Sequence, residues 1–144
     1  MEWAFLIYKS NYWLLFPAIV PLKFECERPE VLKLAAQKYL QNIERSPPEK
    51  LNGFVRYLQE VRKVRIIDVR SGSLIVTVEC SSREIFEALW EDYTSGNINK
   101  VANKYLVTEE ILVALGLGVG VLLTTTIPVT KYAESMDYFA VSVM

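Results

Sequence analysis

Apolar and polar residues alternate strictly from Leu22 to Glu27, where the sequence reads LKFECE. A period of two is typical of a strand with one buried face. Apolar residues at helical spacing then run to Glu44, and Pro29 is tolerated in the first turn of such a helix. The prolines at 47 and 48 end this pattern, and a shorter helical pattern follows from about Glu49 to Val61.

Two more strands are predicted, from Val64 to Arg70 and from Ser73 to Cys80, joined by Ser71-Gly72. A two-residue connection with glycine predicts a hairpin, because tight hairpin turns need positive φ angles. Such a turn would pair Val69 with Leu74 and Ile67 with Val76. One face of the hairpin would then hold Ile67, Val69, Leu74, Val76 and Val78. The other, mixed face would hold Val64, Ile66, Asp68, Ile75, Thr77 and Glu79.

The rest of the chain predicts helices and one strand. The run Ser81 to Glu84 fits a capping box, and the helix that it starts carries an apolar stripe that includes Leu89. The pattern breaks at Ser95-Gly96 and resumes as a second amphipathic helix, with Ser95 or Asn97 as its cap. A further helix starts near residue 108, a strand is expected from Val119 to Ile127, and helical spacing continues to the carboxyl end.

This order of elements, β-α-β-β-α-β with small added helices, predicts an α+β fold. We expect a two-layer sandwich with a four-stranded antiparallel sheet, helices on one face and the other face open, as in ferredoxin-like folds. The length of 144 residues suits one domain, which we place at residues 22–144.

Residues 1–21 form a strongly apolar stretch that we interpret as an amino-terminal arm. Lys9 to Asn11 and the prolines at 17 and 21 divide it, so its apolar runs are too short for a membrane span of about 20 residues. The alternatives that stay open are an extended packing arm, a segment that lies at a membrane interface, and a start that is not a natural domain boundary.

The composition argues against catalysis. The chain has no histidine, which removes the commonest general base and zinc ligand. Its net charge of −1 argues against a dedicated nucleic-acid binder, and a basic cluster at Arg62, Lys63, Arg65 and Arg70 fits a solvated strand entry better than a phosphate site. We therefore predict no enzyme, no cofactor and no metal.

Two further features have a structural interpretation. Glu91 and Asp92 are adjacent on a helix and point about 100° apart, so we expect a solvated polar face there and not a catalytic pair. Cys26 and Cys80 lie in apolar strand patterns and are expected to be buried and reduced, which favours a cytoplasmic location.

The run RSGSLIVTVECSSREIFEALWEDYTSGNINKVANKYLVTEEI, residues 70–111, resembles the amino-terminal domain of the TNF-receptor-associated death-domain adaptor (TRADD) family, and more closely its invertebrate-type members. The similarity consists of the hairpin, the motif L-x-x-x-Y-x-x-G at Leu89, Tyr93 and Gly96, and the amphipathic stripe after it. It extends more weakly over Leu22 to Ile127. The resemblance implies an α/β sandwich that acts as an adaptor in innate-immune or cell-death (apoptosis) signalling.

The resemblance also implies a protein partner, the carboxyl-terminal domain of a TRAF protein, bound along the open sheet face and the hairpin. By position, Asp68 and Ile75 would contact this partner, and the predicted hairpin register adds Ile66 and Thr77 to the same face. Two alternatives remain: an interaction domain held near a membrane by the apolar amino-terminal segment, and a small-ligand regulatory domain.

Overall fold

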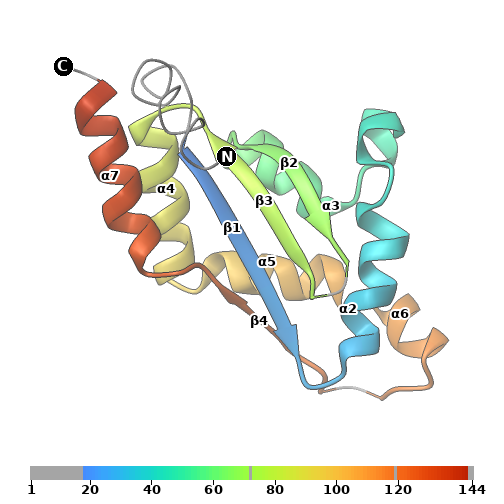
Figure 1. The fold of residues 1–144 in the computed structure, drawn as a ribbon. Helices are drawn as coiled ribbons and strands as arrows, with labels where there is room; N and C mark the ends of the chain where they lie inside the picture. Colours follow the sequence, from blue (N-terminus) through green and yellow to red (C-terminus); the bar gives the residue numbers. More distant parts are fainter. Residues whose placement is uncertain (1–17, 72, 119, 143–144) are drawn as a thin grey trace, which may run out of the picture.

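The computed structural model describes residues 18–142, except for residues 72 and 119, and Figure 1 shows their arrangement. Residues 1–17, which make up most of the expected arm, lie outside the described residues. Four strands form one sheet: β1 (Ala18–Cys26), β2 (Arg65–Arg70), β3 (Ile75–Cys80) and β4 (Leu123–Thr126). Their order is β2-β3-β1-β4, and all neighbouring strands are antiparallel. The α+β class and the four-stranded antiparallel sheet are thus confirmed, whereas the ferredoxin-like assignment stays a prediction.

Strand β1 begins at Ala18, earlier than the expected start at Leu22, and so takes in part of the segment assigned to the arm. Pro21 obscured this extension, because proline is rare inside strands. The strand tolerates it because β4 pairs only with Lys23–Cys26, which leaves β1 with a strand partner on one side at Pro21. The missing N–H of proline therefore need not interrupt a ladder.

The helical segments between β1 and β2 are short and irregular. The first helix, α2 (Pro29–Ala35), continues as a π-helix, η1 (Ala36–Leu40). Two 3₁₀ turns follow, η2 (Ile43–Arg45) and η3 (Pro48–Lys50). The next helix, α3 (Gly53–Arg56), continues as a second π-helix, η4 (Tyr57–Val61). The helix expected to run to Glu44 therefore ends at Leu40. Asn42 follows in the left-handed backbone region, with φ 60°, so the chain turns there.

After β3 the helices are more regular. They are α4 (Arg83–Thr94), α5 (Asn97–Leu106), α6 (Glu109–Ala114) and α7 (Thr130–Ser142). The hydroxyl of Ser82 accepts a hydrogen bond from the Ile85 amide at 3.2 Å, so Ser82 is the residue of the expected capping run that caps α4. Gly96, with φ 85°, separates α4 from α5 as the glycine at this break predicted, but Gly96 is itself the N-cap of α5, so the expected cap at Ser95 or Asn97 is wrong.

The core lies on one face of the sheet. Along β1 and β3 alternate residues are buried, and they pack with Val31 of α2, Phe54 of α3, Leu89 of α4 and Ala102 of α5. Opposite them, the alternate residues of β1 and β3 are exposed or half-buried. Figure 1 shows α4 and α5 beside the sheet, with α7 next to α4 at the amino-terminal end of β1. One sheet face therefore carries the core and the other is open among the described residues.

The hairpin register differs from the predicted one. Val69 pairs with Val76, not Leu74, and Arg70 pairs with Ile75, so the connection is longer than two residues. A register shift between Ile66 and Asp68 leaves Ile67 as the extra residue of a bulge. A bulge reverses the alternation of faces on its far side. The predicted face assignment is consequently wrong for Ile66. It is also wrong for Val64, which is buried in the core, and for Ile67, which is 39% exposed.

Candidate functional site: the open face of the sheet

The candidate site is the sheet face opposite the core, which we call the open face. The strand registers define its members. They are Ile19, Pro21, Lys23 and Glu25 of β1; Arg65, Asp68 and Arg70 of β2; Ile75, Thr77 and Glu79 of β3; and Thr124 and Thr126 of β4. Each of these side chains is exposed or half-buried, so they form a continuous surface across the four strands.

The structure brings together three of the four residues predicted from the sequence. Asp68 of β2 lies directly opposite Thr77 of β3, and Thr77 in turn lies opposite Pro21 of β1. Ile75 occupies the next position on this face of β3, between Arg70 and Lys23. These residues share one surface, but whether a partner binds there stays a prediction.

Ile66 does not join them. It pairs with Val78, whose side chain is fully buried, and it packs half-buried against the core. The physical reason is the bulge at Ile67, which places Ile66 on the core side while Asp68 points to the open face. No periodicity in the segment RIIDVR reveals where a bulge inserts its extra residue, so sequence analysis missed this.

Two further residues of the open face were not predicted. Ile19 has 41% of its surface exposed, and Pro21 is half-buried beside Thr77. Ile75 lies diagonal to Pro21 across the two central strands and directly opposite Lys23, and we call the three apolar residues the Ile19–Ile75 strip. The apolar/polar alternation of LKFECE does not extend to residues 18–21, which are all apolar, so the sequence pattern did not show which of them face away from the core.

Charged side chains surround this strip. The Arg65 guanidinium lies 3.3 Å from the Glu79 carboxylate, and the Arg70 guanidinium lies 3.5 Å from that of Asp68. Both arginine side chains are more than two-thirds exposed, so these ion pairs are screened by solvent and contribute little to stability. An apolar centre with a charged rim is the composition of a protein-binding surface.

Helix α7 borders the open face near Glu79. Burial raises the pKa of Tyr138 above its ordinary value, and the negative charge of Glu79 raises it further.

Glu91 and Asp92, near the end of α4, were both expected on a solvated polar face, and this prediction is wrong for Asp92. Glu91 is exposed as expected, but Asp92 retains only 8% exposure. Its carboxylate accepts hydrogen bonds from the Tyr57 hydroxyl at 2.5 Å and from the Asn97 side-chain amide at 2.7 Å. Sequence analysis missed this cluster because Tyr57 is distant in the chain.

Arg62 completes the cluster. Its guanidinium lies 4.0 Å from Asp92, donates to the Ala88 carbonyl at 3.1 Å and covers the ring of Tyr57. Burial and the hydrogen bond to Asp92 raise the pKa of Tyr57 to about 12. Arg62 is thus held inside the fold, so the basic cluster predicted from the sequence does not form one exposed patch.

The described residues can be compared with the requirements of a metal site, a reactive thiol and a membrane-spanning helix. Within them, no group of three or more cysteine, aspartate or glutamate side chains could hold a metal ion. Both cysteines are free; Cys80 is buried as expected, whereas Cys26 is half-buried. Burial raises the pKa of the Cys80 thiol to about 12, which keeps it protonated and unreactive. In the same part of the chain, no helix has the length and apolar character needed to cross a membrane.

Comparison with known proteins gives one family. Residues 48–111 match the model of the TRADD-like N-terminal domain, a segment of 64 of the 144 residues. Neither the curated proteins nor the solved structures provide a significant match. The matched segment runs from η3 into α6, and it includes the β2–β3 hairpin that supplies half of the strands of the open face. This match confirms the resemblance recognised in residues 70–111: the segment from Pro48 to Ile111 is similar to the TRADD-like N-terminal domain, a family of adaptor domains that is not enzymatic.

Proposed function

We propose that this chain is an adaptor that docks the carboxyl-terminal domain of a TRAF-type protein on its open face, in innate-immune or cell-death signalling. The adaptor role follows from the family match, which suggests a protein partner. The observation that carries the docking surface is the Ile19–Ile75 strip, an apolar centre on a sheet face that no described element covers.

The open face has the physical properties that docking requires. Its side chains project from paired strands, so the backbone is already ordered and binding costs little conformational entropy. Ile75 and Pro21 lie at the centre of the surface, where removal from water contributes most to affinity. Arg65, Asp68 and Arg70 lie at the rim, where charges mainly set specificity and association rate.

The test is the substitution Ile75→Asp. It places a carboxylate at the centre of the apolar strip, so binding to a TRAF carboxyl-terminal domain should weaken by more than about tenfold, the equivalent of about 1–2 kcal/mol for an interface anchor. Ile75 points away from the core, so the melting temperature should change little. Calorimetric titration gives the affinity, and thermal melting monitored by circular dichroism gives the stability.

The matched control is Val129→Asp. Val129 is 77% exposed and precedes α7, so the same charge is added at an apolar side chain outside the open face. The control should bind the TRAF domain as the wild type does. If the wild type fails to bind any TRAF domain at high micromolar concentration, TRAF docking is wrong. If Ile75→Asp binds as tightly as the wild type, the open face is not the docking surface.

A further inference from the structure

The two edge strands of the sheet differ in the hydrogen bonds that their outward backbone groups form. At the β4 edge, the side chain of Asn103 accepts from the Leu123 amide at 2.9 Å and donates to the Leu123 carbonyl at 3.0 Å. Asn99 accepts from the Thr125 amide at 2.9 Å and from its hydroxyl at 3.0 Å. These asparagines of α5 occupy the backbone groups that another strand would need. The β4 edge is therefore closed to strand addition.

The opposite edge has no such closure. Within the described residues, no backbone group of β2 forms a hydrogen bond outside its ladder with β3. An edge strand with free amides and carbonyls is a template for a further extended segment. The open edge is six residues long, which matches a short peptide strand.

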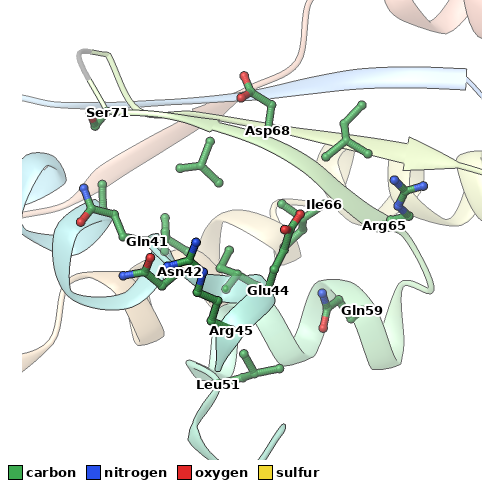
Figure 2. A pocket seen from close by; sticks show the side chains of 15 residues that line it. Gln41, Asn42, Glu44, Arg45, Leu51, Gln59, Arg65, Ile66, Asp68 and Ser71 are labelled. Atoms are coloured by element: carbon green, nitrogen blue, oxygen red, sulfur yellow. The ribbon is translucent and has the colours of Figure 1, made fainter. Parts of the chain in front are cut away.

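A groove runs along this open edge. Its volume is about 660 Å³, and Figure 2 shows β2 as one wall and the segment Gln41–Arg45 as the other. Leu40, Ile43, Leu51, Ile66 and Val69 give it an apolar lining, in which Leu40 is buried and the others are half-buried. Its rim is polar, with Gln41, Asn42, Glu44, Arg45, Gln59, Arg65 and Asp68. Ile66, which the bulge removes from the open face, thus lines this groove.

The charges beside β2 are mainly positive. The side chains of Arg65 and Arg70 are 72% and 76% exposed, and Lys63, at the approach to the strand, is exposed as well. Asp68 of β2 and Glu79 of β3 form ion pairs with Arg70 and Arg65 at 3.5 and 3.3 Å, so the third cation, Lys63, leaves this side with a net positive charge. On the far wall, Glu44 and Arg45 supply one charge of each sign. The side of the open edge that faces solvent therefore favours an acidic ligand.

These features select one occupant. A strand added to β2 would alternate its side chains between the apolar groove below and the arginines above, because successive side chains point to opposite faces. A second copy of this chain fits poorly, since pairing two β2 strands antiparallel about their centre would set Arg65 opposite the other copy's Arg70. We propose that the β2 edge binds an extended protein segment with alternating apolar and acidic residues, as an added strand. This second docking mode does not depend on TRAF binding at the open face.

The experiment uses the full chain labelled with ¹⁵N and three soluble hexapeptides, acetyl-EVEVEV-amide, acetyl-KVKVKV-amide and acetyl-EEEVVV-amide. The alternating acidic peptide should give saturable amide shifts in residues 65–70 and 41–45. Both other peptides should bind about tenfold more weakly. The basic peptide places its lysines beside Arg65 and Arg70, and the non-alternating peptide cannot direct its acids to the arginines and its valines to the groove at the same time. The proposal is overturned if EVEVEV causes no saturable shift at millimolar concentration, or if the three peptides bind equally.

Two variants of the protein test the charges. In Arg65→Glu/Arg70→Glu the preference should invert, so that KVKVKV binds more tightly than EVEVEV. The matched control is Arg83→Glu/Lys100→Glu, which makes the same change in net charge at exposed side chains on α4 and α5. The control should keep the wild-type preference. An equal inversion in both variants would show a general charge effect and overturn the assigned site.

N-methylation tests strand addition itself. In an added strand only alternate amides face the edge, so methylating one set of three amides in EVEVEV should abolish binding while methylating the other set should preserve it. Equal effects of the two sets would refute binding as a strand. The amide spectrum of each protein variant reports in the same experiment whether the fold is intact.

Discussion

The substitution Asp92→Ala tests whether the break between α4 and α5 is a structural joint. Asp92 connects three residues: Tyr57 from η4, Asn97 from the start of α5, and Arg62 after η4. Alanine removes both carboxylate oxygens, so the Tyr57 hydroxyl loses its acceptor, whereas the Asn97 amide keeps the Tyr57 oxygen at 2.9 Å and Arg62 keeps the Ala88 carbonyl at 3.1 Å. Glu91, its exposed neighbour on the same helix, has no such contacts and provides the matched control Glu91→Ala.

The magnitude follows from the two short hydrogen bonds. A hydrogen bond to a charged group contributes about 1.5–3 kcal/mol, so two would contribute about 3–6 kcal/mol if their donors stayed unpaired after the substitution. The Tyr57 hydroxyl is half-buried and Asn97 is exposed, so water replaces part of the loss. We therefore expect Asp92→Ala to lower the free energy of unfolding by about 2–4 kcal/mol, and Glu91→Ala to change it by less than about 0.5 kcal/mol.

Urea denaturation followed by circular dichroism measures both values. The conservative variant Asp92→Asn keeps one side-chain oxygen as an acceptor and should fall between the two alanine variants. A double-mutant cycle with Arg62→Ala separates the ion pair, which at 4.0 Å should couple more weakly than the hydrogen bond to Tyr57. Equal free energies for Asp92→Ala and Glu91→Ala would refute the structural role of the cluster.

Three further predictions concern the core, the thiols and the closed edge. Leu89 is fully buried, so Leu89→Ala should cost about 2–5 kcal/mol in urea denaturation, and a loss below about 1 kcal/mol would contradict its place in the core. Iodoacetamide at pH 8 should modify Cys26 well before Cys80, because burial and a pKa of about 12 keep the Cys80 thiol protonated; peptide mass spectrometry shows the order, and faster reaction at Cys80 would contradict it. Asn103→Ala should speed hydrogen exchange at the Leu123 amide, which loses its acceptor, while an unchanged rate would show that the β4 edge is not closed by this side chain.

Local sequence patterns predicted the elements better than they predicted the contacts between them. The hydrophobic period indicated the four strands, the helix with Leu89 and the break at Gly96, because each depends on neighbours within a few residues. The strand bounds were less accurate: β1 begins at Ala18 and not at Leu22, and β4 covers only Leu123–Thr126 of the strand expected from Val119 to Ile127. The bulge at Ile67 and the asparagines that close β4 depend on partners in other elements. Asn99 and Asn103, four residues apart on one helix, were the available signal, since asparagine is a poor helix former.

In the candidate site, too, local patterns predicted some positions, and contacts with distant elements decided the others. Asp68, Ile75 and Thr77 were correctly grouped on one face, because the register error at the turn is two residues, which keeps each side chain on its face, and all three lie on the turn side of the bulge. Ile66, before the bulge, was misplaced. The burial of Asp92 could not be inferred from charge patterns, which treat adjacent acids as solvated unless their distant partners are known.

The most direct test of docking on the open face is methyl cross-saturation in a complex with a TRAF carboxyl-terminal domain. Irradiating the TRAF domain transfers saturation only to methyl groups at the interface. The Ile75 and Ile19 methyl signals should lose intensity, whereas those of Val113 and Val129, which are 71% and 77% exposed outside the open face, should not. Saturation of Val113 or Val129 with Ile75 unaffected would contradict docking on the open face.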